Sequence, residues 1–252
     1  MTLRIAMWSG PRNLSTAMMR SFGARADTVV SDEPFYGAYL NTSGADQPMK
    51  DAVIASMDCD WHRVAAALSG PATAPIWYQK HMAHHMIGPI DFADLHDFTH
   101  AFLIRDPARV IASYAAKRVT VSPDDLGYVR QRDWFNREAD RRGSAPPVIA
   151  SADVLRDAEA TLTMLCSSLG IAFDPAMLHW PAGGRATDGI WASHWYGRVL
   201  DSTGFEAAET APPVLDAAAC RVRDACLPHY DALFAHRLNR QKPLTKALVA
   251  GG

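Results

Sequence analysis

Cysteine is scarce in this chain and does not occur in a spacing that binds metal. The sequence has 252 residues and four cysteines, which are Cys59, Cys166, Cys220 and Cys226. None of them forms a Cys-x-x-Cys pair, and zinc sites and the disulfide frameworks of small secreted domains both need closely spaced or numerous cysteines. We therefore expect neither feature, and we expect free thiols in a reducing cytoplasm.

The sequence also lacks an excess of positive charge and a long apolar run. Lys and Arg total 25 and Asp and Glu total 27, so the formal net charge is −2 and no basic field attracts nucleic acid or acidic lipid. No apolar run reaches the roughly 20 residues of a membrane helix. The apolar stretch before Gly10-Pro11 is too short for a signal peptide. We expect a cytoplasmic protein that binds neither nucleic acid nor a membrane, with its oligomeric state left open.

What the sequence does contain is enough apolar residues for a core, arranged in alternating strands and helices. Hydrophobic residues make up 48% of the chain and charged residues 21%, which is ordinary for a globular domain. Short β-rich runs are separated by segments of helical spacing, and these runs are residues 3–8, 28–31, 76–80, 100–105 and 148–149. Such alternation predicts an α/β fold with a central, mainly parallel sheet and helices on both faces.

The domain organisation that follows is simple. We expect one domain over residues 1–240 and a basic, flexible tail over residues 241–252. The Gly- and Trp-rich segment 183–205 has no clear periodicity, and we expect a loop there. In parallel sheets the ligand lies beyond the carboxyl ends of the strands, so the residues that follow each strand are the candidates for a site.

The first predicted strand leads into the loop Gly10–Thr16, and a helical pattern begins at Ser15. Unpaired backbone N–H groups at the start of a helix suit a phosphate or sulfate group. Arg12 adds a cation, and Ser15 and Thr16 add hydroxyl groups. The loop is neither a Walker A sequence nor a Gly-x-Gly-x-x-Gly fingerprint. An ordinary strand–helix turn is the alternative for this loop taken alone.

The fourth predicted strand ends at Arg105, and Ser113 lies about two turns into the helix that follows. Both side chains can therefore reach one anion at the carboxyl edge of the sheet. For this segment taken alone, the alternative is a solvated arginine and a serine packed in mid-helix.

Together the two segments resemble the cofactor loops of the sulfotransferases that use 3′-phosphoadenosine 5′-phosphosulfate (PAPS). The family's first loop runs Pro-Lys/Arg-Ser-Gly-Thr-Thr, and residues 11–16 read Pro-Arg-Asn-Leu-Ser-Thr. The second loop, Arg-x-Pro/Ala-x-x-Val-x-x-Ser-Tyr, is matched by Arg105, Val110, Ser113 and Tyr114. The resemblance covers residues 1–180, because residues 148–155 and the helix after them are similar to the family's Tyr-Glu-Asp-Leu segment. Two departures are Leu14 in place of Gly and Ser151-Ala152 in place of Tyr-Glu.

The resemblance implies a P-loop sulfotransferase-like fold and the transfer of a sulfuryl group from PAPS to a hydroxyl or amine of a small-molecule acceptor. No metal is needed in this family. The residues implied in holding PAPS are Arg12, Asn13, Leu14, Ser15, Thr16, Arg105 and Ser113. Arg12 would also neutralise the bridging oxygen as the bond to sulfur breaks, and Arg105 and Ser113 would bind the 3′-phosphate.

The base that removes the acceptor's proton has two candidates. Glu33 directly follows the second strand, at the place of a catalytic glutamate in some members of the family. His81 lies beside Lys80 after the third strand, and the resemblance makes both candidate catalytic residues, because the cytosolic enzymes carry Lys-x-His there; in this sequence the two residues are adjacent. Either group can accept a proton from a hydroxyl within hydrogen-bond reach, so the choice stays open.

The aromatic residues of segment 191–196 have two possible roles. The residues Trp191, His194, Trp195 and Tyr196 fall where the family has a loop that covers the cofactor, and core packing is the other reading. Arg185 and Arg198 flank them and can add phosphate contacts.

Two alternative functions remain for the whole protein. They are a P-loop kinase-like phosphotransferase and a non-catalytic nucleotide-binding protein of the same fold. A kinase is disfavoured by the missing Gly-Lys-Ser/Thr ending.

Overall fold

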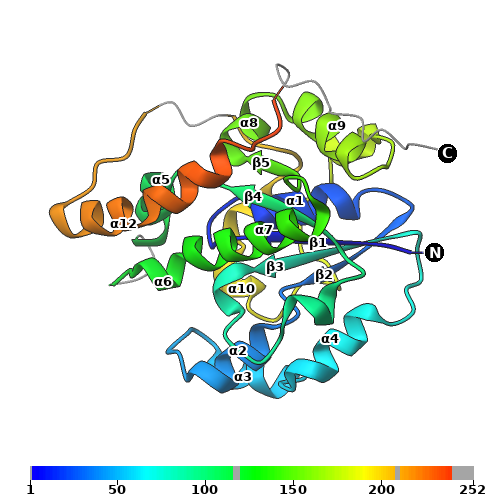
Figure 1. Ribbon diagram of the computed structural model, residues 1–252, viewed down its shortest axis with the longest axis horizontal. Helices are drawn as coiled ribbons and strands as arrows, with labels where there is room; N and C mark the ends of the chain where they lie inside the picture. The colour runs from blue at the N-terminus through cyan, green and yellow to red at the C-terminus, as the bar shows by residue number, and fades with distance from the viewer. Residues whose placement is uncertain (1, 116–119, 208–210, 240–252) are drawn as a thin grey trace.

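The computed structural model describes residues 2–115, 120–207 and 211–239, so the predicted tail 241–252 lies outside the described residues. Its centre is a five-stranded parallel sheet with the strand order β2-β3-β1-β4-β5 (Figure 1). The strands are β1 (Leu3–Ser9), β2 (Thr28–Asp32), β3 (Ile76–Met82), β4 (Thr99–Ile104) and β5 (Val148–Ala150). All five predicted strands and the parallel sheet are confirmed.

The sheet is buried on both faces, as the side chains of β1 show. Ile5 and Met7 belong to one apolar cluster, whereas Ala6 and Trp8 belong to another on the opposite face. All four side chains are fully buried. Alternate side chains of a strand point to opposite faces, so a strand that is apolar throughout must be covered on both sides.

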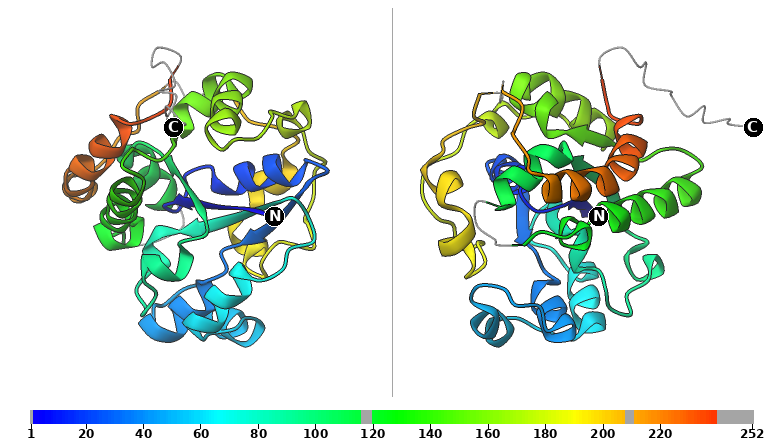
Figure 2. Two further views of the ribbon diagram at one scale, coloured as in Figure 1. Left: turned by 45° about the vertical axis from the view of Figure 1, so that its right-hand side comes forward. Right: turned by 90° about the vertical axis from the view of Figure 1, so that its left-hand side faces the viewer.

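Helices cover the two faces in separate groups (Figure 2). Helix α1 (Ser15–Gly23) and helix α9 (Ala158–Ser168) contribute to the cluster of Ile5 and Met7. Helices α2 (Tyr36–Ser43), α4 (Trp61–Ser69) and α7 (Tyr128–Arg142) pack in the cluster of Trp8. The predicted arrangement of helices on both faces is therefore confirmed.

The remaining elements lie around this core. They are α3 (Lys50–Ser56), η1 (Ala83–His85), η2 (Phe92–Leu95), α5 (Pro107–Ala115), α6 (Pro123–Leu126), α8 (Ser151–Arg156), η3 (Pro175–Leu178), α10 (Ala192–Trp195), α11 (Gly197–Asp201) and α12 (Ala217–Phe234). Among the described residues, no helix combines the length and the apolar character needed to cross a bilayer. The four cysteines are free thiols.

The register of the sheet brings the carboxyl ends of the strands to one edge. Ser9 pairs with Met82 of β3 and with Leu103 of β4, and Asp32 pairs with Lys80. The residues that follow β1, β2 and β4 therefore lie side by side. These are the segments that the sequence singled out.

Candidate active site

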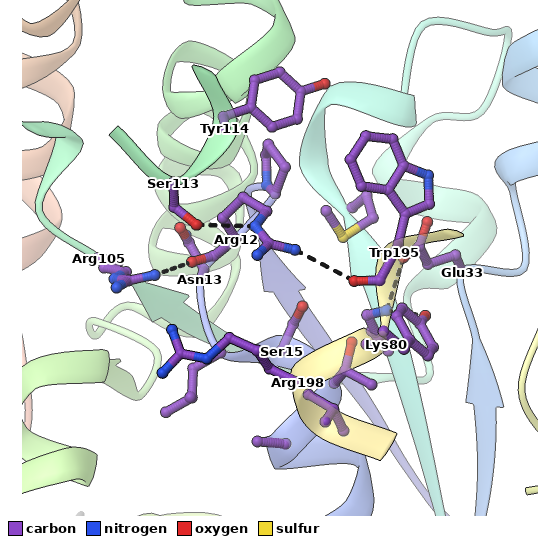
Figure 3. Close-up of a pocket in the computed structure, with 18 of the residues that line it drawn as sticks. Arg12, Asn13, Ser15, Glu33, Lys80, Arg105, Ser113, Tyr114, Trp195 and Arg198 are labelled. Carbon is purple, nitrogen blue, oxygen red and sulfur yellow. Dashed lines mark hydrogen bonds and ion pairs between the residues drawn. The ribbon is translucent and has the colours of Figure 1, made fainter. Parts of the chain in front are cut away.

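A cavity of about 410 Å³ lies at this edge of the sheet (Figure 3). Its walls come from the loop after β1, the ends of β2 and β3, helix α5, and the segment around α10 and α11. Nine of the ten predicted site residues line it, and they are Arg12, Asn13, Leu14, Ser15, Thr16, Glu33, Lys80, Arg105 and Ser113. His81 does not line it. The structure thus brings together residues that are up to about a hundred positions apart in the chain.

The loop after β1 has a strained backbone where it meets the cavity. Arg12 has φ 61° and Leu14 has φ 71°, in the left-handed region that residues with a Cβ seldom adopt. Glycine, the family's residue in place of Leu14, takes this conformation without cost. Leu14 precedes α1 without a side-chain cap, and the first α1 residues, Ser15 and Thr16, line the cavity. The left-handed residues turn the chain from β1 into α1, whose start lies at the cavity wall, and such strained backbone is common at functional sites.

Asn13 supports this loop from behind. Its side chain is fully buried, and its amide lies 3.4 Å from the Leu103 carbonyl oxygen. The Ser151 hydroxyl donates to the Asn13 carbonyl oxygen at 2.8 Å and lies 3.1 Å from the Ile104 carbonyl oxygen. Asn13 is thus bonded within the protein. Sequence reasoning missed Ser151 as a support, although its place directly after β5 was an available signal.

Three arginine side chains gather on one side of the cavity, here called the arginine side (Arg12, Arg105 and Arg198) (Figure 3). Arg12 donates from Nε to the Ser113 hydroxyl at 3.0 Å and from Nη1 to the Trp195 carbonyl at 3.3 Å. Arg105 donates to the Arg12 carbonyl at 2.6 Å. Burial lowers the pKa of Arg12, and the charges of Arg105 and Arg198 lower it further.

The charges of the arginine side are compensated only in part, because Arg198 pairs with Glu206, which also lines the cavity. Among the described residues, no carboxylate forms an ion pair with Arg12, and its two acceptors are neutral. An arginine stays charged in a protein even when its pKa falls. A half-buried cluster of like charges is stabilised when an anion binds to it. This side of the cavity therefore suits a phosphate or sulfate group.

The opposite side of the cavity is here called the lysine side, and it consists of Asp32, Glu33, Lys80 and Tyr196. Its positive and negative charges lie in contact and offset one another. Lys80 Nζ lies 2.9 Å from Asp32 Oδ1, 2.7 Å from Glu33 Oε1 and 2.6 Å from the Tyr196 hydroxyl. Burial alone would lower the pKa of Lys80, but the two carboxylates outweigh it and raise that pKa well above its usual value. Lys80 is therefore a cation.

Glu33 lies where the chain turns out of the sheet. Its backbone has φ 47°, and its N–H donates to the Lys80 carbonyl at 3.0 Å. Burial raises the pKa of Glu33, and the Lys80 ammonium opposes that shift without cancelling it. A buried carboxylate with a raised pKa that lines a cavity is suited to accept a proton near neutral pH. The geometry therefore favours Glu33 over His81 as a base.

His81 is placed away from the cavity because β3 is longer than predicted. The strand continues to Met82, and alternation turns Lys80 and Met82 toward the cavity and His81 to the other face. The His81 ring stacks on Trp8 at 4.6 Å and its Nε2 lies 3.1 Å from Gln79 Oε1. Burial lowers the pKa of His81 to about 3. His81 is therefore a neutral packing residue, not an acceptor-facing base.

Segment 183–205 packs against the core and also lines the cavity, and that it covers a cofactor stays a prediction. Tyr196 is buried, its hydroxyl lies 2.7 and 2.8 Å from the Asp32 oxygens, and Trp191 Nε1 donates to it at 3.1 Å. Trp195 instead lines the cavity and stacks on Tyr114 at 6.2 Å. The segment also holds two short helices, α10 and α11, where the sequence predicted a loop.

Further contacts hold segment 183–205 in place, and one of them involves Asp32, which sequence reasoning missed. Asp188 forms an ion pair with buried Arg20 of α1 at 2.5 Å, and the Gly189 N–H donates to Asp32 Oδ2 at 3.1 Å. Asp32 therefore joins this segment to the lysine side, and its place next to Glu33 at a strand end was the only signal for it. Arg198 lines the cavity, whereas Arg185 donates to carbonyl groups of its own segment.

The described residues contain no group of three His, Cys, Asp or Glu side chains placed to hold a metal ion. That the protein works without a metal stays a prediction. The guanidinium groups that face the cavity from the arginine side have donors only, and they bind anions.

Comparison with known proteins identifies a family. The family described as a sulfotransferase domain matches residues 3–237. Among curated proteins, branched-chain-amino-acid aminotransferase-like protein 2 of Arabidopsis thaliana is 32% identical over 97% of this chain and 44% of its own length. The corresponding protein 1 is 33% identical over 92% of this chain and 42% of its own length. The chain thus spans less than half the length of these relatives.

Solved structures agree on the fold. A sulfotransferase from Alicyclobacillus acidocaldarius has a TM-score of 0.56 at 11% identity, covering 95% of this chain and 98% of its own. The sulfotransferase domain from the curacin biosynthetic pathway has a TM-score of 0.50 at 14% identity, covering 89% and 97%. At such low identity these likenesses show the α/β fold alone.

Proposed function

The chain belongs to the sulfotransferase domain family, and on that premise we propose that it transfers a sulfuryl group from PAPS to a hydroxyl or amine of a small-molecule acceptor. The observation that carries the proposal is the division of the cavity into two sides. The arginine side carries Arg12, which donates to neutral groups and has no acidic partner among the described residues, and the lysine side has a buried carboxylate, Glu33, held by Lys80.

The residues present fit PAPS as the donor. PAPS carries a 5′-phosphosulfate and a 3′-phosphate, and it supplies the activated sulfuryl group. The start of α1, with Ser15 and Thr16, and the guanidinium of Arg12 would hold the 5′ end. Arg105 and Ser113 would hold the 3′-phosphate. Arg198 adds a third cation at the cavity wall, where it pairs with Glu206.

The chain's own groups then have distinct tasks. Arg12 stabilises negative charge that develops on the phosphate oxygen, and a preorganised donor of this kind contributes about 3–4 kcal/mol. Glu33 accepts the proton of the acceptor group. Lys80 keeps Glu33 in place, because it donates to Glu33 Oε1 at 2.7 Å and is itself fixed by Asp32 and Tyr196.

Nucleotide binding tests the donor. Adenosine 3′,5′-bisphosphate, the product left after transfer, should bind more tightly than 5′-AMP in calorimetry, by roughly ten- to a hundredfold for a 3′-phosphate held by charge-assisted hydrogen bonds. Equal affinity for the two nucleotides would contradict the assignment of PAPS. Incubation with PAPS and a panel of alcohols, phenols and amines then tests transfer, with mass spectrometry to detect the sulfated product.

A non-catalytic nucleotide-binding protein would show the same nucleotide preference without any product. The catalytic alternative is supported by Glu33, a buried acid that lines the cavity beside the arginine side and is held by Lys80.

A further inference from the structure

We propose, on the premise of the function above, that Glu33 and His85 together form a subsite for the oxygen atom of an acceptor hydroxyl, and that this subsite favours hydroxyl acceptors over amines. His85 lines the cavity and was not among the residues singled out as a candidate base or ligand. The inference goes beyond the proposed function because it selects one of the two acceptor classes.

The His85 ring is held in a fixed orientation. It is the last residue of η1, directly after β3, and its side chain is 3% exposed. The ring lies parallel to the Tyr36 ring, with centroids 4.6 Å apart, and stacks on Tyr39 at 4.7 Å. Packing on both of these rings leaves the imidazole edge with Nε2 near Glu33.

The distance between the two groups leaves space for one oxygen atom. His85 Nε2 lies 4.0 Å from Glu33 Oε2, which is too long for a direct hydrogen bond. An oxygen atom about 2.8 Å from each of them would complete two hydrogen bonds. The other carboxylate oxygen, Oε1, already accepts from Lys80 at 2.7 Å. Oε2 is therefore the oxygen placed to take a proton.

The surroundings of His85 decide which ring nitrogen carries the proton. Nδ1 is buried and has no hydrogen-bond partner among the described residues. A proton on Nδ1 would bury an unsatisfied N–H and turn the Nε2 lone pair toward the Glu33 carboxylate. A proton on Nε2 avoids both costs. Burial and the nearby His84, Lys80 and His81 lower the pKa of His85 well below its usual value, so the ring is neutral. His85 is thus a hydrogen-bond donor toward Glu33.

This donor suits a hydroxyl and not an amine. A hydroxyl oxygen has two lone pairs and one proton. One lone pair can accept from His85 Nε2–H while the proton points to Glu33 Oε2, and the second lone pair attacks sulfur. The new S–O bond forms as the S–O bond to the phosphate of PAPS breaks, with its electron pair left on the phosphate oxygen. The hydroxyl proton moves to Glu33 Oε2.

A neutral amine has one lone pair only. If that lone pair accepts from His85, it is not available to attack sulfur. If it attacks sulfur, the His85 N–H loses its partner at the buried subsite, which costs free energy. An ammonium group has no lone pair until it loses a proton. Amines should therefore react more slowly than the matched alcohols.

The tautomer is measurable without any reaction. Nitrogen NMR of the full chain labelled at histidine distinguishes the Nδ1–H, Nε2–H and doubly protonated forms, and His85→Gln identifies the His85 signal by its loss. We expect the neutral Nε2–H form at and above neutral pH. The Nδ1–H form or a charged imidazolium would overturn the subsite, whatever the protein's activity.

Kinetics with a matched pair of acceptors tests the selectivity. Benzyl alcohol and benzylamine differ only in the reacting group, and PAPS is the donor for both. We expect the wild type to prefer the alcohol. His85→Phe keeps a stacking ring but removes the donor, and kcat for the alcohol should fall roughly 10- to 100-fold, with a smaller change for the amine. His85→Gln retains a donor near Nε2 and should recover most of the loss.

Controls separate this inference from the proposed function. His96→Gln removes a histidine whose side chain is 66% exposed, and it should match the wild type. Adenosine 3′,5′-bisphosphate should bind all variants equally, which shows that they are folded. A wild type that prefers the amine, or a His85→Phe variant that slows both acceptors equally, overturns the subsite. If the nucleotide binds and no acceptor of the panel reacts, the proposed function fails at transfer, and the tautomer decides the subsite alone.

Discussion

The two sides of the cavity differ in how their charges are compensated. On the arginine side, Arg12 donates to the neutral hydroxyl of Ser113 and to a carbonyl group. On the lysine side, Lys80 faces two carboxylates and a hydroxyl within 2.6–2.9 Å. The first arrangement is stabilised by a bound anion, whereas the second is stable by itself. The difference separates binding from chemistry: the arginine side is built to hold the donor, and the lysine side is built to position a base.

The largest expected effect comes from removing the base while keeping its shape. Glu33→Gln retains an oxygen that can accept from Lys80 but cannot take a proton. Turnover should fall by about 10²–10⁴, the usual worth of a positioned general base. The affinity for adenosine 3′,5′-bisphosphate should stay almost unchanged, because no phosphate contact involves Glu33. Single-turnover rates and calorimetry on the same variant measure the two effects.

His81→Asn is the matched control, since His81 was the other candidate base. Its side chain packs on Trp8 outside the cavity, so we expect a loss of stability with turnover reduced only a few-fold. An inactive, folded His81 variant beside an active Glu33→Gln would reverse the assignment.

The pH dependence of turnover follows from the same residue. Glu33 must be ionised to act as a base, and burial raises its pKa. Activity should therefore fall as the pH drops through that raised value, at a higher pH than for an exposed glutamate. The charged and titratable groups around it are Asp32, Lys80 and Tyr196, with His85 at 4.0 Å. An acid limb of the rate profile within the usual range of an exposed glutamate would contradict the burial of the base.

A smaller effect is expected on the arginine side. Arg105→Ala should weaken adenosine 3′,5′-bisphosphate binding by roughly ten- to a hundredfold and leave 5′-AMP binding nearly unchanged, because a charge-assisted hydrogen bond contributes about 1.5–3 kcal/mol. Arg137→Ala is the control, since its side chain is 59% exposed and pairs with Asp91 at the surface. Equal weakening of both nucleotides would mean that Arg105 acts only by supporting the Arg12 carbonyl, to which it donates at 2.6 Å.

The sequence predicted the two sides unequally, and the reason is physical. Arg12, Arg105 and Ser113 lie in short segments that each follow a strand, so local pattern and the parallel sheet were enough to bring them together, whereas Arg198 comes from α11. The lysine side depends on Tyr196, which lies 164 positions from its partner Asp32. No local periodicity encodes that contact. His81 was misplaced because two additional strand residues reversed the direction expected for its side chain.

The free energy of unfolding tests whether the hydrogen bonds of the Tyr196 hydroxyl stabilise the lysine side. Tyr196→Phe removes a buried hydroxyl bonded to Asp32, Lys80 and Trp191. Leaving such partners unsatisfied typically costs about 1–3 kcal/mol of unfolding free energy. Tyr78→Phe is the matched control, because the Tyr78 hydroxyl is buried with no partner among the described residues. We expect Tyr78→Phe to be neutral or stabilising in urea unfolding. An equal loss in both variants would mean that packing, and not the Tyr196 hydroxyl, carries the effect.

The smallest expected effect is that of a chelator, and it distinguishes the two kinds of group transfer. A kinase-like phosphotransferase relies on magnesium to neutralise the charge that develops on its phosphates. In this cavity the same task falls to Arg12, supported by the charges of Arg105 and Arg198. EDTA should therefore leave both the affinity for adenosine 3′,5′-bisphosphate and the rate of sulfuryl transfer unchanged. Added magnesium should change neither, and ATP should not replace PAPS. A loss of activity in EDTA that magnesium restores would assign the charge-neutralising role to a metal and favour the phosphotransferase. Arg12→Ala completes the comparison, because a loss that added magnesium does not rescue would show that the guanidinium itself performs that role.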